Sequence, residues 1–391
     1  MKSNHCNVSD ECGMILITVQ LLIFMLIAVG VGSVVSVQNN YRVSVNLRGG
    51  MAALYLAESG IEWAKEQIGT AATMPLALSD DGRSLAAGSF AVTFVAFTQA
   101  SPLTARVVVR STGNLSDSSQ TVQAGITKSY DLADGALVLR GESRGINFAG
   151  ESFLIDGRDR DPVTRSLVGG AKPRLGISVA GAGLLSRVNQ ALSDAQANHV
   201  VSGDTGRGAI AESGWLTSDA IATMAEGICR APTAHTSFIG ALGNLSLADR
   251  TLGTRESPEI HCFEGPIGSG DSAIFTGNIS GAGILVVRNA EMVISGTFVW
   301  EGFVVVTGRD IGLSVSGVAS KQIIGALLIN ETAVGLGSGA AMADVQGNVR
   351  VLYSRLALDL AATLIPNATL QSSYVNLPFA LKQDYWRSIA P

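Results

Sequence analysis

The chain has 391 residues, 47% of them hydrophobic and only 15% charged, so it is long enough for two or three domains and too apolar to be disordered. Its net charge of -5, with no cluster of Lys and Arg, argues against a nucleic-acid partner. The 45 glycines and four histidines favour many tight turns and little histidine-based chemistry.

The first expected element is a long helix that begins in an apolar segment. Residues 14–37 carry no charge. A helix of that length spans about 36 Å, which is enough to cross the hydrocarbon core of a bilayer, about 30 Å. We therefore expect one transmembrane helix at residues 14–37. The only side chains there more polar than glycine are Thr18, Gln20, Ser33 and Ser36.

The helical pattern continues past the membrane to residue 70. Apolar residues recur at helical spacing and predict an amphipathic continuation, in which Gly49 and Gly50 allow a kink. A signal anchor followed by an unrelated helix fits the same pattern, and this alternative stays open. The apolar positions are Val43, Leu47, Met51, Leu54, Leu56, Ile61, Ala64 and Ile68.

A single glycine, Gly13, separates a hydrophilic start from the apolar run. A removable secretory signal would have a basic start and a shorter apolar core, so it fits poorly. Cleavage after Gly13 explains the glycine, because a peptidase at the cytoplasmic face needs an extended backbone without a side chain at the scissile bond. We expect residues 1–13 to be a leader and Met14 to begin the mature chain.

These features resemble a known family. Gly13 followed by Met14 and an apolar helix is similar to the leader junction of type IV prepilins, and the segment LRGGMAALYLAESGIEWA resembles the signature of PilX-type minor pilins. Later phrases, FLIDGRDRDP, PRLGISV and GAGILVVRNAEMVISGTFVWEGFVVVTG, are similar to large bacterial proteins that carry the same N-terminal domain. The residues that carry the signature are Leu47, Arg48, Ala57, Glu58, Ser59, Gly60 and Glu62.

The resemblance implies processing and partners. A prepilin peptidase would cut after Gly13 and N-methylate Met14. The chain would then meet other major and minor pilins and the inner-membrane pilus assembly platform. It would be held in the bacterial inner membrane by one span with a periplasmic head, or lie outside the cell at a pilus tip.

The fifth mature position is Thr18, where pilins usually have a glutamate that neutralises the amino terminus of a neighbouring subunit. An unpaired ammonium in an apolar core costs several kcal/mol. A subunit without this carboxylate is therefore best placed where no earlier subunit lies above it. Thr18 at this sequence position therefore favours a subunit that lies at the tip of a filament.

A small antiparallel sheet is expected next, within residues 71–130. Three segments between residues 89 and 127 alternate apolar and polar residues and are separated by turn residues, which predicts a three-stranded meander. Packed on the soluble half of the helix, this sheet would bury Leu54, Ile61 and Ile68.

The sequence pattern changes in residues 131–391, where short β-rich runs recur about every twenty residues. ILVV at Ile284 recurs as FVVV at Phe303 and IGALL at Ile324, and MVISG at Met292 recurs as LSVSG at Leu313. This period predicts a β-solenoid, similar to a right-handed β-helix, with an earlier copy at residues 136–157. A sandwich of antiparallel strands is the alternative. Corner glycines are expected at Gly283, Gly296, Gly308, Gly317 and Gly325.

Helices interrupt the strands at about residues 181–230. The segments GLLSRVNQALSDAQAN and LTSDAIATMAEGI have helical periodicity, and Thr217 or Ser218 is a suitable N-cap for the second.

Two cysteines remain if the leader, with its own two cysteines, is removed. Cys229 and Cys262 would lie in an oxidising compartment, so we expect a disulfide, whose loop of just over thirty residues would contribute about 3 to 4 kcal/mol. Free thiols, or a zinc site completed by His235 and His261, are the alternatives. Adjacent His261 and Cys262 would point to opposite faces of a strand, which disfavours zinc.

Three carboxylates in the segment DGRDRDP could bind calcium or pair with their own arginines. Asp156, Asp159 and Asp161 are interleaved with Arg158 and Arg160, and EF-hand spacing is absent. This pattern favours a solvated, self-paired turn.

The sequence thus predicts an α+β protein: a long N-terminal helix, a small antiparallel sheet and a large β-rich domain. No catalytic motif occurs where its structural context requires, and we expect no catalytic residue, metal or cofactor. The expected function is a minor pilin-like structural subunit that primes or caps a type IV pilus or pilus-like filament and presents its head for adhesion or subunit contact. The alternatives are a membrane-anchored β-helix enzyme or binding protein acting on envelope polysaccharide, and a static scaffold with an uncleaved anchor.

Overall fold

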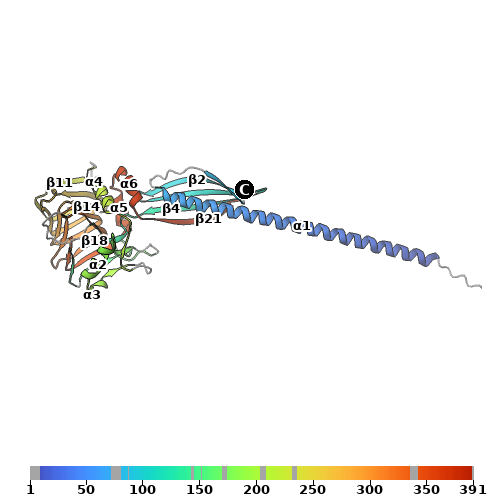
Figure 1. The fold of residues 1–391 in the computed structure, drawn as a ribbon, viewed down its shortest axis with the longest axis horizontal. Coiled ribbons are helices and arrows are strands. Elements are labelled where there is room, and N and C mark those ends of the chain that lie inside the picture. Colours follow the sequence, from blue (N-terminus) through green and yellow to red (C-terminus); the bar gives the residue numbers. More distant parts are fainter. Residues whose placement is uncertain are drawn as a thin grey trace, which may run out of the picture.

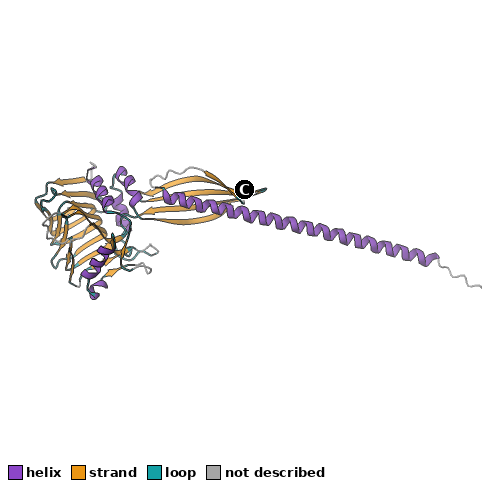
Figure 2. Cartoon of the chain, in the orientation of Figure 1, coloured by secondary structure: helices purple, strands orange, loops and turns teal. Residues whose placement is uncertain are grey.

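The computed structural model describes residues 9–71, 81–86, 88–141, 145–150, 152–169, 174–202, 208–230, 236–334 and 342–389, with side chains from Leu16 onward. One long helix projects from a head that contains a small antiparallel sheet and a large, curled parallel sheet (Figures 1 and 2). This is the α+β architecture that the sequence predicts.

The long helix α1 (Ser9–Thr70) is continuous over 62 residues. At 1.5 Å per residue its length is about 93 Å. It includes Gly13 and Met14, and it runs through Gly49 and Gly50 without interruption.

Only the second half of α1 packs against the head. Val43, Leu47 and Met51 belong to the apolar stripe expected from the sequence, but they are 56%, 63% and 56% exposed. The reason is that the small sheet reaches down α1 only to about Gly49, which lies against Ser118. The buried positions of α1 are Ala53, Leu56, Ala57, Gly60, Ile61, Ala64 and Ile68.

The small sheet has five antiparallel strands in the order β1-β2-β3-β4-β21. The expected meander is present as its three central strands, and side chains that alternate along them bury one face against α1. The strands are β1 (Asp81–Leu85), β2 (Gly88–Ser101), β3 (Thr104–Leu115), β4 (Ser118–Tyr130) and β21 (Phe379–Ile389).

The last strand of this sheet comes from the end of the chain. The sequence pattern assigns residues 131–391 to one β-rich domain, but β21 pairs with β4 along its whole length, from Phe379 with Tyr130 to Ile389 with Thr121. The backbone N–H of Asp131 also donates to the carbonyl of Pro378 at 2.9 Å. The large domain is therefore an insertion between two neighbouring strands, with its entry and exit side by side.

The large sheet is a parallel solenoid with three faces, and its 16 described strands pair with one another only in parallel. The alternative of an antiparallel sandwich is wrong. The first face has the order β10-β8-β5-β18-β16-β14-β13-β11, the second β6-β19-β17-β15-β14-β12, and the third β9-β7-β20-β18-β16-β14-β12. The longer strands continue round a corner from one face to the next.

The strands of the solenoid have the following bounds. They are β5 (Gly135–Gly141), β6 (Ile146–Ala149), β7 (Leu154–Asp156), β8 (Leu175–Val179), β9 (Val200–Val201), β10 (Ile210–Glu212), β11 (Thr236–Gly240), β12 (Asn244–Leu252), β13 (Glu259–Glu264), β14 (Ser272–Arg288), β15 (Glu291–Ile294), β16 (Thr297–Arg309), β17 (Gly312–Val315), β18 (Lys321–Ala333), β19 (Ala343–Gln346) and β20 (Val349–Tyr353).

The expected repeat is confirmed, with one change of register. Ile284 pairs with Phe303 and Met292 pairs with Leu313, as their spacing predicts. Phe303 pairs with Ala326 rather than with Ile324, because the connection from β17 to β18 makes this coil longer than the one before.

The coils do not stack in chain order. The coil of β5, β6 and β7 lies directly against the coil of β18, β19 and β20, which is the last one in the chain. After β10 the chain crosses the first face to its far end and then builds the remaining coils back toward the start.

Corner glycines make this tight stacking sterically feasible. Gly283, Gly302 and Gly325 lie above one another where the third face turns into the first, with φ of 118°, 129° and 138°. A Cβ on Gly302 would lie 2.1 Å from the carbonyl oxygen of Gly283. Gly308 and Gly317, two other expected corners, also have positive φ, whereas at Gly296 a Cβ would meet the backbone of Gly277.

In the part of the chain that the structure describes, six short helical segments lie around the solenoid. The first predicted helix is divided by Ser193, which caps α3, and Thr217 caps α4 by accepting from the N–H of Ala220 at 3.3 Å. Helix α4 carries the chain across the first face of the solenoid to its far end, and it contacts β18, β16 and β13 on the way. The segments are α2 (Ala182–Ala191), α3 (Asp194–Ala197), α4 (Ser218–Arg230), α5 (Arg355–Ala362), α6 (Asn367–Ser373) and the 3-10 helix η1 (Tyr374–Asn376).

Candidate functional site

The first half of α1 is an apolar rod that nothing in the described structure covers. An 18-residue window within it has a mean hydropathy of 2.4 and is 0% buried. Its large side chains are about half or more exposed, for example Leu16 at 66% and Phe24 at 63%. By length and composition, this is the one helix among the described residues that could cross a membrane. The rod is a candidate site for contact with lipid or with other apolar helices.

The predicted processing residues lie at the free end of α1. Gly13 and Met14 are part of its helical backbone, and Thr18 is exposed on the rod. Cleavage after Gly13 stays a prediction.

The family-signature residues divide between two sides of α1. Ala57 and Gly60 are buried against the small sheet. A Cβ on Gly60 would lie 2.1 Å from the Ser111 Oγ, so the glycine permits this close contact. Glu58, Ser59 and Glu62 lie on the outer side of the helix, where each is at least partly exposed.

The outer-side signature residues line a groove between α1 and β21. Two neighbouring cavities of about 660 and 580 Å³ lie along this seam, and Glu62 lines both. We call it the β21 groove. The first cavity is lined by Tyr55, Glu58, Ser59, Ile61, Glu62, Gln383 and Trp386, and residues of α1, β4, β21 and the neighbouring solenoid loops line the second.

The second cavity ends at a buried lysine that joins α1 to the small sheet. The Lys128 ammonium donates to the carbonyl oxygens of Ile68 at 2.8 Å, Gly69 at 3.0 Å and Ala71 at 2.6 Å. These carbonyls belong to the C-terminal end of α1, where a cation is favourable. Burial lowers the pKa of Lys128 to about 8. Sequence periodicity cannot distinguish such a lysine from a solvent-exposed strand residue.

The expected disulfide is present. Cys229, at the end of α4, is bonded to Cys262 in β13, and both are buried. The zinc alternative is wrong because both sulfur atoms are consumed. The Nε2 atom of His261 lies 3.0 Å from a Glu259 carboxylate oxygen, and His235 lies outside the described residues. No group of metal-binding side chains is found in the part of the chain that the structure describes.

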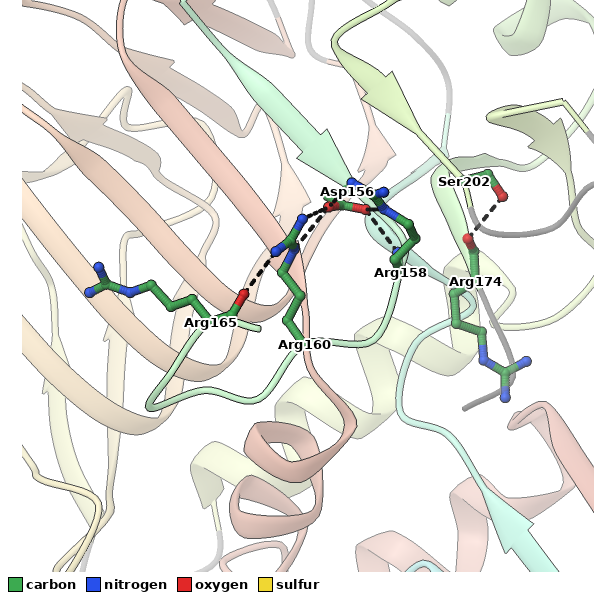
Figure 3. Close-up of polar contacts among 6 residues, drawn as sticks. All are labelled: Asp156, Arg158, Arg160, Arg165, Arg174 and Ser202. Carbon is green, nitrogen blue, oxygen red and sulfur yellow. Dashed lines mark hydrogen bonds and ion pairs between the residues drawn. The ribbon is translucent and has the colours of Figure 1, made fainter. Parts of the chain in front are cut away.

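The acidic turn is self-paired, as its arginines predict (Figure 3). Asp156 accepts from Arg158 at 2.9 Å and from Arg160 at 2.8 Å. Burial opposes its ionisation, but these hydrogen bonds outweigh that effect and lower the pKa of Asp156. The expectation of a solvated turn is wrong for Asp156, which is fully buried. Asp161 instead caps its own turn at the N–H groups of Val163 and Thr164.

The buried ion pair between Arg140 and Asp134 was not predicted. The Arg140 guanidinium is 1% exposed and donates to Asp134 at 2.9 Å, to the carbonyl of Leu216 at 2.8 Å and to that of Trp215 at 2.9 Å. It thereby fixes the loop before α4 to the first face of the solenoid. The only sequence signal was an arginine within the apolar strand ALVLRG.

The fold and this site define an α+β protein that carries a free apolar helix, a helix-covered antiparallel sheet and an inserted parallel solenoid. No family model and no curated protein matches the chain. Among solved structures it is similar to the competence-associated pilin ComZ from Thermus thermophilus, with 12% identity over 87% of this chain and 97% of that chain and a TM-score of 0.29.

Proposed function

We propose that this chain is a pilin-like subunit that is anchored in the bacterial inner membrane by α1 and enters a pilus-like filament through the same helix. One observation carries the proposal: no described residue in the apolar half of α1 is buried, and this half continues without a break into the half that bears the sheet. Such a rod is stable only in lipid or among other apolar helices. The head, with its polar surface, would lie on the periplasmic side.

Processing is part of this proposal. Residues 1–13 would be removed by a prepilin peptidase, and Met14 would become the N-methylated first residue. Thr18 would then be the fifth residue of the mature chain, where it offers no carboxylate to a neighbouring amino terminus. This absence, together with the bulk of the inserted solenoid, supports a role in priming or capping the filament beside other major and minor pilins.

The PilX-type signature supports the same role at the level of α1. Ala57 and Gly60 hold the sheet against the helix, while Glu58, Ser59 and Glu62 remain available to other subunits. The solenoid would present a surface for adhesion or subunit contact, outside the cell if the chain reaches a tip. The inner-membrane assembly platform would act on α1. The proposal includes no catalytic step.

Mass spectrometry of the mature N-terminus tests the processing step. A chain that begins at N-methylated Met14 is expected, and Gly13→Leu should leave the leader in place. Gly32→Ala is a matched control, because Gly32 lies in the same helix with no atom within 4 Å of an added Cβ. An intact Met1 in the wild-type chain would contradict the proposal.

Immunogold labelling of purified fibres tests whether this chain lies at the fibre ends. Label is expected at fibre ends, and fewer fibres should form without this chain. Thr18→Glu supplies the missing carboxylate and should move some of the label from the ends to the shaft. Fibres that contain none of the chain, and that form normally without it, would rule out the role.

A further inference from the structure

The small sheet extends beyond α1 on the side of β21. α1 packs over β2, β3 and β4, and β21 lies beyond it as the edge strand (Figure 1). Leu381 and Trp386 pair with Lys128 and Ala124, whose side chains face α1. Directly paired residues share a face of an antiparallel sheet, so these two side chains of β21 lie on the helix side. They form the floor of the β21 groove.

The floor has the width that a second helix needs. β21 is two strands away from β3, near the middle of the strands that α1 covers. Adjacent strands are about 4.8 Å apart, so a helix on β21 would lie about 10 Å from α1, within the usual spacing of packed helices. Its neighbours would be apolar, since Trp386 is 42% exposed and Leu381 is 36% exposed.

The wall of the groove is acidic. Glu58, Glu62 and Glu66 stand at four-residue spacing along α1, and among them Lys65 pairs with Glu62 at 2.6 Å. Like charges at this spacing destabilise a helix by themselves. A neighbouring helix with Lys or Arg at the same spacing would pair with these carboxylates, and the attraction would offset their mutual repulsion.

The groove opens toward the free half of α1. At its other end Gly69 lies against Leu381, and Trp215 and Val375 from the solenoid complete the cavity. β21 runs back from there toward the exposed rod, and its last residue, Ile389, pairs with Thr121, next to the Gln120 side chain that lies near Gly50 of α1. An occupant therefore enters along α1 from the direction of the membrane.

We propose that the β21 groove holds the amphipathic helix of a second single-span subunit, a different protein that carries basic residues at four-residue spacing just beyond its membrane segment. A second copy of this chain in the same register would place its own Glu58, Glu62 and Glu66 against these carboxylates, and like charges repel. The partner would be another subunit of the same filament, so this proposal rests on the proposed function.

The test uses the full-length chain in its native membrane, before fibres are extruded. A photoreactive phenylalanine analogue replaces Leu381 in one variant and Lys382 in the control. The two residues are adjacent in β21, but Lys382 pairs with Thr127 on the opposite face and its side chain is 81% exposed. Mass spectrometry identifies the crosslinked peptides after irradiation.

The variant at Leu381 should crosslink to one single-span protein, within a helix that carries Lys or Arg at four-residue spacing, and the control at Lys382 should not. Glu62→Lys should lower the yield about tenfold by replacing attraction with repulsion. A Lys→Glu change at the matching partner position should restore it.

Equal yields at both positions, adducts with lipid or with a second copy only, or no effect of Glu62→Lys would each overturn the inference. The fibre experiment remains independent of this outcome. Fibre-end label without the groove crosslink refutes only the groove, and the crosslink without any fibre label refutes only the filament role.

Discussion

Lys128 is the residue that fixes the end of α1 to the small sheet. Its ammonium satisfies three carbonyl oxygens at the helix end, and it lies over the rings of Tyr130 and Phe379 at 4.8 and 4.6 Å from their centroids. Burial opposes its charge, whereas these contacts favour it. The result is a cation whose protonation is coupled to folding.

The pH dependence of stability should report this coupling. Burial lowers the pKa of Lys128 from 10.5 to about 8, so between these values the unfolded chain binds more protons than the folded one. The contribution of Lys128 to the free energy of unfolding should therefore rise by up to about 3 kcal/mol from pH 8 to pH 10.5.

Denaturant unfolding in detergent measures this change, as the difference between wild type and Lys128→Met. Readings stop near pH 10, because burial raises the pKa of Tyr130 to about 12 and gives it the opposite slope at higher pH. A difference that stays constant from pH 7.5 to pH 10 would refute the coupling.

The disulfide also acts at the scale of single residues. Cys229 ends the helix that crosses the solenoid, and Cys262 belongs to a strand near the far end of the first face. Removing the disulfide by the double substitution Cys229→Ser with Cys262→Ser should lower the free energy of unfolding by about 4 kcal/mol in the chain-entropy model.

Thermal or denaturant unfolding with and without a reducing agent checks the disulfide. Reduction should lower the stability of the wild-type protein to about that of the double variant and leave the stability of the variant unchanged. Equal stability of the oxidised wild type and the variant would show that the disulfide between α4 and β13 does not stabilise the fold.

At the scale of elements, the corner glycines decide how closely the coils stack. Gly283, Gly302 and Gly325 combine a positive φ with a carbonyl or amide group of the neighbouring coil in the space of a side chain. Aliphatic side chains fill the interior between the corners, with Phe263, Phe275 and Phe298 in edge-to-face contact along the stack.

Gly302→Ala should destabilise the solenoid by about 3 kcal/mol, because it adds a strained φ to a backbone clash. Gly214→Ala is the control, since an added Cβ there meets no atom within 4 Å, and it should change stability by less than about 0.5 kcal/mol. Unfolding of both variants by denaturant provides the comparison. Similar losses of stability in the two variants would mean that the corner geometry does not limit how closely the coils stack.

At the scale of the whole molecule, the solenoid is an insertion between β4 and β21. Tyr130 pairs with Phe379, and the next residue pair, Asp131 and Pro378, is already hydrogen-bonded. The ends of the insertion are thus close enough to be joined by a short hairpin turn.

Replacing residues 132–377 by Asn-Gly should leave α1 and the five-stranded sheet folded and membrane-bound. The control is a chain truncated after residue 130, which also loses β21 and exposes the edge of β4. Limited proteolysis and circular dichroism in detergent should show a stable module for the first and a protease-sensitive one for the second. Equal sensitivity would mean that the small sheet depends on the solenoid.

The sequence determined what depends on local pattern. An uncharged run predicted the exposed apolar half of α1, alternation predicted the central strands of the small sheet, and spacings such as Ile284 to Phe303 predicted the coil repeat. The pairing of Cys229 with Cys262 was predicted over free thiols and a zinc site, because these are the two cysteines outside the expected leader, and the structure contains the bond. These features depend on side-chain type and short separations, which a single sequence displays.

The tertiary structure alone decided which distant segments meet. The pairing of β21 with β4, the packing of the coil at β5 against the coil at β18, and the groove lined by Glu62 and Trp386 all join residues that are far apart in the chain. Backbone hydrogen bonding is the same for every strand, so no residue pattern names the partner. That choice follows from how the apolar surfaces of the whole chain can be buried together.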